Sequence, residues 1–199
     1  MNPLSQRESE CIKAIQTNSP SVVDNLRGLD LNTQTTPLYI LVNFRNWDGL
    51  QYALNNTTRF DVLLHAAATT EWLEAVDLIL PHAAPNDISR AAMACARNNN
   101  LESLKRLAPH CKSLRECVIP ACFSQRALPV LHFLLERGEA QRVRDDFKDI
   151  SRDNDPKMMS IVEGEKFWGA LDFLREHTTR WELEQVTHNH GSNPPSKKM

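Results

Sequence analysis

The clearest pattern in the sequence lies between Val62 and Ala84, where apolar residues recur at helical spacing in two short runs. The first run, 63–68, combines two leucines with three alanines, and the second, 73–80, is rich in Leu, Val and Ile. Each run is too short to form a stable helix alone. The pattern therefore predicts two helices that fold against each other as a hairpin.

The same pattern recurs along the chain when His65 is taken as the reference position. The equivalent positions are separated by 27, 26, 28, 27 and 40 residues, and they are Ile12, Tyr39, His65, Met93, Pro120 and Ser160. Eleven residues after each comes an apolar residue of the second helix, namely Val23, Leu50, Val76, Leu104, Leu131 and Leu171. One register thus places two helices in each of six segments, and we expect Leu50, Val76, Leu104 and Leu131 to be core residues.

The predicted organisation is one repeat domain over residues 1–186. Its repeats lie near 9–32, 33–60, 61–85, 86–113, 114–140 and 157–186. The longer last interval reflects a charged insertion at 139–157, for which we expect a helix followed by a surface loop. Repeat six is interrupted by Gly169, and Trp181–Val186 is expected to add a final helical turn. The polar, Pro-containing tail 187–199 is expected to be disordered.

The repeat resembles the helix-loop-helix body of the ankyrin repeat family. Thr36-Pro37-Leu38-Tyr39 is similar to the opening tetrapeptide of that family, and His65 and Leu73 are spaced as the family's His and Leu are. The turn at 97–100 resembles the family's Arg-Asn-Gly-x, with Asn in the left-handed position. The resemblance implies an all-α, ankyrin-like α-solenoid of about six helix-loop-helix repeats, with a structural His65 that links neighbouring repeats.

The short period marks a departure from that family. An ankyrin repeat has about 33 residues because a β-hairpin finger joins successive units. A spacing near 27 predicts that the fingers are shortened or missing. An array of helical hairpins outside any named family is the alternative fold.

Composition and charge argue against some classes of function but do not identify one. The net charge of −2 provides no general attraction to nucleic acid or to an anionic membrane, and no run of about 18 apolar residues exists. The first residues show no signal-peptide pattern. We therefore expect a cytoplasmic protein that binds neither nucleic acid nor membrane.

The five cysteines are odd in number and have no framework spacing, which favours reduced thiols. A zinc site could be formed by residues of the usual ligand types, namely His110, Cys111, Cys117 and Cys122. However, Cys122 and Cys95 fall at positions where the first helix of a hairpin needs a small residue. We favour the packing role and expect no metal.

No nucleotide-binding or hydrolase motif is present, so we expect neither enzymatic activity nor a cofactor. The alternative is an enzyme of unknown class with a site near the acidic insertion 139–157. Five aspartates there could ligate a hard cation, namely Asp145, Asp146, Asp149, Asp153 and Asp155.

Binding of another protein is the function that we expect, through the turns and the concave face of a monomeric repeat stack. Aromatic and Arg residues at the turns within the hairpins are candidate contacts because these types dominate interface hot spots. The candidates are Phe44, Arg45, Trp72, Arg97 and Arg126. In the alternative interpretation, Phe44 and Trp72 pack sideways onto the adjacent turn.

Overall fold

A computed structural model describes residues 5–123, 128–146 and 161–191. These residues are helical throughout, with no β-strand among them. The first ten α-helices form five hairpins. They are α1 (Gln6–Gln16) with α2 (Val22–Arg27), α3 (Thr36–Asn43) with α4 (Trp47–Asn56), α5 (Phe60–Thr69) with α6 (Leu73–Ile79), α7 (Pro85–Asn98) with α8 (Leu101–Leu107), and α9 (Arg115–Phe123) with α10 (Leu128–Glu136). The 3-10 helices η1 (Leu80–His82) and η2 (Ala108–His110) extend α6 and α8.

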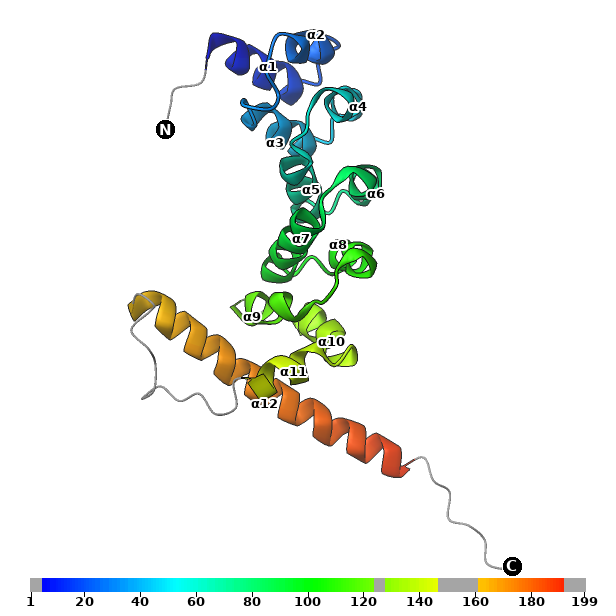
Figure 1. Cartoon of the computed structure of the whole chain (residues 1–199), viewed down its shortest axis with the longest axis vertical. Coiled ribbons are helices and arrows are strands. Elements are labelled where there is room, and N and C mark those ends of the chain that lie inside the picture. Colours follow the sequence, from blue (N-terminus) through cyan, green and yellow to red (C-terminus); the bar gives the residue numbers. More distant parts are fainter. Residues whose placement is uncertain (1–4, 124–127, 147–160, 192–199) are drawn as a thin grey trace, which may run out of the picture.

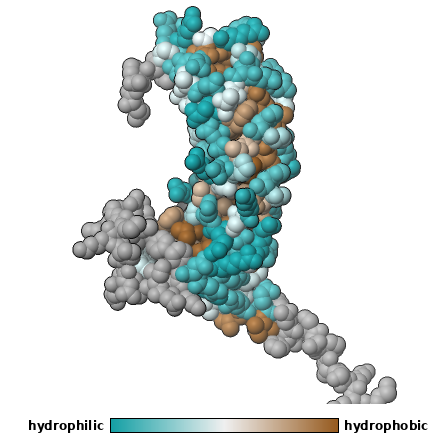
Figure 2. All heavy atoms as spheres, in the orientation of Figure 1, coloured by the Kyte–Doolittle hydropathy of each residue, from teal (hydrophilic) through white to brown (hydrophobic). Residues whose placement is uncertain are grey.

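The hairpins stack in the order of the chain. The first helices α1, α3, α5, α7 and α9 contact one another in sequence, and α2 contacts α4 while α8 contacts both α6 and α10. Figure 1 shows that the stack curves, with the first helices on its inner side and the second helices on its outer side. The visible face consists mostly of hydrophilic residues, between which hydrophobic residues show in narrow areas (Figure 2).

The core runs along the middle of the stack, between the two rows of helices. Leu50, Val76, Leu104 and Leu131, one from each of four hairpins, are completely buried, which confirms the prediction for these positions. The inner helices approach closely through small residues, and Ala66, Ala67 and Ala68 of α5 are all buried. The helical spacing in the sequence therefore identified both the hairpins and their shared core.

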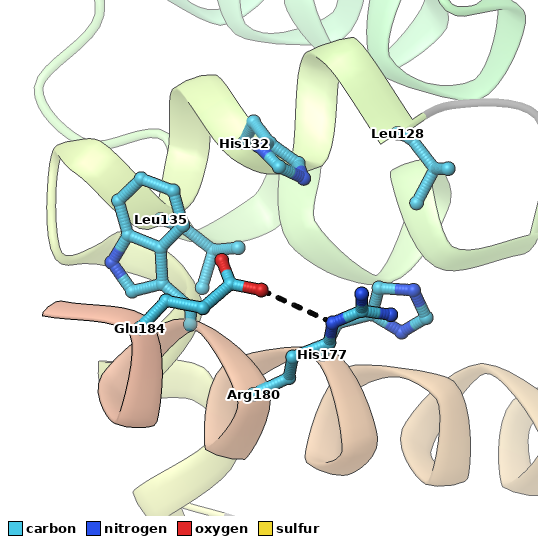
Figure 3. A pocket seen from close by; sticks show the side chains of 7 residues that line it. Leu128, His132, Leu135, His177, Arg180 and Glu184 are labelled. Atoms are coloured by element: carbon cyan, nitrogen blue, oxygen red, sulfur yellow. Dashed lines mark hydrogen bonds and ion pairs between the residues drawn. The ribbon is translucent and has the colours of Figure 1, made fainter. Parts of the chain in front are cut away.

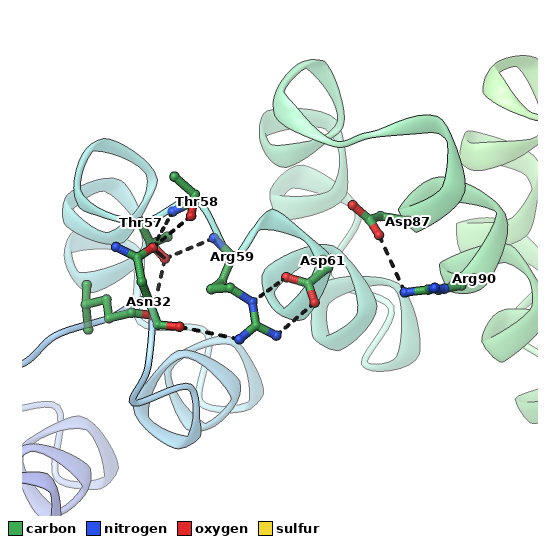
Figure 4. A network of polar contacts seen from close by, with 8 residues as sticks. Asn32, Thr57, Thr58, Arg59, Asp61, Asp87 and Arg90 are labelled. Atoms are coloured by element: carbon green, nitrogen blue, oxygen red, sulfur yellow. Dashed lines mark hydrogen bonds and ion pairs between the residues drawn. The ribbon is translucent and has the colours of Figure 1, made fainter.

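Short irregular segments join successive hairpins where a β-hairpin finger was expected to be trimmed. At the junction of the first three hairpins, the Asn32 side-chain oxygen accepts hydrogen bonds from the Thr58 backbone N–H (2.8 Å) and from the Thr57 hydroxyl (3.2 Å) (Figure 4). Arg59 donates to both carboxylate oxygens of Asp61, each at 2.9 Å. Side-chain hydrogen bonds thus hold this junction without any strand in the described residues.

The C-terminal region differs from the prediction. Instead of a hairpin in repeat six (157–186), a single helix, α12 (Ile161–Gly191), runs through Gly169 and through the segment 181–186. The tail expected to be disordered from residue 187 is helical as far as Gly191, while 192–199 lies outside the described residues. Burial of apolar residues against the stack outweighs the cost of Gly169 in the helix interior, which is about 1 kcal/mol.

The charged insertion begins as predicted with a helix, α11 (Glu139–Asp146). Its remainder, 147–157, lies outside the described residues. α11 contacts α9, α10 and α12, and α12 also contacts α9. These two helices close the C-terminal end of the stack.

Candidate partner-binding surface

The turns inside the first four hairpins share one backbone geometry. Each turn contains a residue in the left-handed region of backbone conformation. The backbone N–H of the next residue donates to the carbonyl of the residue five positions before it, at 2.9–3.0 Å. These residues are Asn18 (φ 48°), Arg45 (φ 51°), Glu71 (φ 52°) and Asn99 (φ 60°). This hydrogen bond is typical of the Schellman motif, which ends many helices. The left-handed Asn99 confirms the prediction for the fourth turn.

Side-chain hydrogen bonds connect each of these turns to the next. Asn46 donates to the side-chain oxygen of Asn18 at 3.0 Å, and Arg45 donates to the backbone carbonyl of Thr70 at 3.3 Å. Asn100 donates to two carbonyl oxygens at the end of α5, at 3.2 and 2.7 Å. The four turns therefore form a continuous, internally connected edge of the stack.

Two aromatic side chains flank Arg45 at the turn of the second hairpin. Phe44 is 51 % exposed and Trp47 is 41 % exposed, although both belong to residue types that are usually buried. Only one other large hydrophobic side chain is exposed in the described part of the first four hairpins, Tyr39 on α3. We call Phe44, Arg45 and Trp47 the aromatic turn.

Trp47 was not among the predicted contacts. Its position in the repeat register is occupied by Leu73 and Leu101 in the next two hairpins, and both leucines are partly buried. The sequence therefore carried no signal that the tryptophan would be exposed. Only the geometry of the turn shows it.

Trp72 does not occupy the exposed position that we predicted for it. Its side chain is 6 % exposed, and its ring meets the ring of Trp47 edge-on, with 5.7 Å between centroids and 60° between planes. The alternative interpretation, packing onto the adjacent turn, holds for Trp72. Its role is to support Trp47 from beneath, because an edge-to-face aromatic pair fixes the orientation of both rings.

Those of the remaining predicted contacts that the structure describes lie along the same edge. Phe44 and Arg45 lie together, and Arg97 is exposed in the last turn of α7, two hairpins further along the stack. Arg126 lies outside the described residues. Arg45 has a structural function as well, since one of its guanidinium nitrogens is engaged by Thr70.

A shallow depression of about 290 Å³ lies on the inner helices. It is lined by Tyr39, Asp61, Val62, His65, Asp87 and Arg90. His65 is exposed there, and its ring makes no hydrogen bond within the described part of the chain, so the predicted link to a neighbouring repeat is not present. The hydrogen bonds from Arg59 hold the pKa of Asp61 below its usual value, and Arg90 lies 4.0 Å from Asp87. Each of the two carboxylates thus has an arginine beside it, Arg59 for Asp61 and Arg90 for Asp87, so the depression does not specify the charge of a ligand.

A second pocket, of about 250 Å³, lies between α10 and α12 (Figure 3). The His132 ring meets the Trp181 ring edge-on at 5.5 Å between centroids, and Arg180 forms an ion pair with Glu184 at 3.1 Å. His177 is hydrogen-bonded through Nδ1 to the carbonyl of Phe173 at 2.9 Å. Most of these contacts are within α12 or attach it to α10, which indicates a packing function.

The aspartates of the acidic insertion that the structure describes are engaged in ion pairs. No group of three or more His, Cys, Asp or Glu side chains within the described ranges is arranged around a common point. Of the acidic insertion, Asp145 pairs with Arg144 at 2.9 Å and Asp146 pairs with Arg115. Asp149, Asp153 and Asp155 lie outside the described residues. The hypothesis of a cation site near 139–157 therefore gains no observation in its favour.

The cysteines are packing residues in this structure. Burial raises the pKa of Cys95, Cys117 and Cys122 to about 12 and that of Cys11 to about 11. Cys111 is half-buried, and its pKa is also raised by burial. A thiol with a raised pKa contains very little thiolate near neutral pH and is correspondingly unreactive.

We expect the native protein to resist a thiol reagent such as DTNB at pH 8. At most one thiol, that of Cys111, should react before unfolding, and all five should react in denaturant. A Cys111→Ser variant should remove the early reaction. Rapid modification of two or more thiols in the native protein would show that the first helices are packed less tightly than the structure has them.

Neither a protein-family model, nor a curated protein, nor a solved structure matches the chain. Among the described helices, none combines the length and the apolar character that crossing a membrane requires. The function must therefore be inferred from the surface itself.

Proposed function

We propose that the chain is an ankyrin-like α-solenoid that acts as a protein-interaction module, as a monomer in the cytoplasm. Its partner contacts the turn edge of the stack, centred on the aromatic turn. The observation that carries this proposal is the exposure of Phe44 (51 %) and Trp47 (41 %) on either side of Arg45. Exposed aromatic and Arg side chains that lie close together are the residue types that most often dominate protein interfaces.

The rigidity of the aromatic turn supports a binding function. The Asn46 side chain caps α4 by accepting a hydrogen bond from the Gly49 N–H at 2.8 Å, and it also donates to Asn18. Trp47 rests against the buried Trp72, and Arg45 is anchored to Thr70. A surface that is held in place loses little conformational entropy when a partner binds.

The ankyrin-like assignment rests on the repeat geometry. The left-handed turn residues follow one another at intervals of 27, 26 and 28 residues, as the sequence register does, and the inner helices stack in chain order. Stacked hairpins of this kind leave the turns and the outward face of the inner helices free for ligands, while the two rows of helices bury the core between them. Tyr39, exposed on α3, extends the proposed surface from the turn edge towards the inner side.

The test is a Phe44→Ala/Trp47→Ala double variant. Once a partner has been captured from cell lysates and identified by mass spectrometry, this variant should weaken binding by about 2 kcal/mol or more, measured by calorimetry with purified partner. Circular dichroism should show an unchanged helix content.

The matched control is a Leu183→Ala/Val186→Ala double variant, which removes two apolar side chains that are at least as exposed, at the other end of the molecule. It should bind the partner as the unmodified chain does. Normal binding by the Phe44→Ala/Trp47→Ala variant together with loss of binding by this control would assign the surface to α12 instead.

A further inference from the structure

We draw no further inference here: the strongest candidate, the pocket of about 470 Å³ at the starts of α7 and α9, is lined by the opposite charges of Lys112 and Glu116, and its Arg115 is already engaged in an ion pair with α11, so nothing in it identifies a ligand.

Discussion

A Leu104→Asp variant is expected to lose about 3–5 kcal/mol of unfolding free energy at neutral pH. Leu104 is completely buried in α8, in the row of second helices, between hairpins that contact it on both sides. The substitution removes apolar contacts and also places a carboxylate inside the hydrophobic core. An uncompensated buried charge is much more costly than a missing methylene group, so the charge accounts for most of the loss.

Urea unfolding followed by circular dichroism measures this loss, and Val76→Asp should behave in the same way because Val76 is the equivalent buried residue of α6. Lys105→Asp is the matched control. It introduces the same side chain one residue along the helix, where Lys105 is exposed and forms only a surface ion pair with Glu102 at 2.8 Å. Its loss should be about 1 kcal/mol or less. Equal losses for Leu104→Asp and Lys105→Asp would contradict the buried position of Leu104.

The predictions that succeeded rest on properties that repeat along the chain. The buried positions Leu50 and Val76 follow from one helical register, because a row of stacked hairpins must place equivalent apolar residues at equivalent depth. Asn99 could be predicted as left-handed because few residue types adopt that conformation readily. Helical periodicity and the backbone preference of a residue type both depend on neighbouring positions in the chain, so they can be recognised in the sequence.

The predictions that failed depend on contacts between hairpins. Trp72 and Trp47 are both aromatic residues near a turn, and the sequence cannot show which of the two rings covers the other. Gly49 is a further feature that the sequence did not reveal, because a Cβ there would come within 2.6 Å of a Leu41 methyl in the same hairpin and 3.1 Å of a Val22 methyl in the preceding one. Arg45 looked like a free interface residue, yet its strained backbone and its bond to Thr70 give it a structural function too.

The C-terminal helix was missed for a related reason. The register placed Leu171 in the second helix of a sixth hairpin and took Gly169 as an interruption. In the structure, a Cβ on Gly169 would meet no atom within 4 Å, so the glycine marks neither a bend nor a close contact. The buried residues Trp168, Leu171 and Leu174 lie one helical turn apart and form a single face. This face packs on the end of the stack, where the last hairpin would otherwise leave its apolar surface in water.

A Leu171→Asp variant tests this closing function, and we expect it to destabilise the C-terminal end of the stack by about 3–5 kcal/mol. Leu171 is completely buried in α12, which contacts both α9 and α11. The end of a stack has neighbours on one side only, so α12 should detach and expose α9 before the N-terminal hairpins unfold. Hydrogen exchange measured by mass spectrometry should therefore show lost protection in α9, α11 and α12 and retained protection in α3 and α5.

Leu183→Asp is the control on the same helix, since Leu183 is 63 % exposed, and its exchange should match that of the unmodified chain. Uniform loss of protection across all hairpins in Leu171→Asp would show that the stack unfolds as one unit, and unchanged protection in α9 would show that α12 does not close the stack.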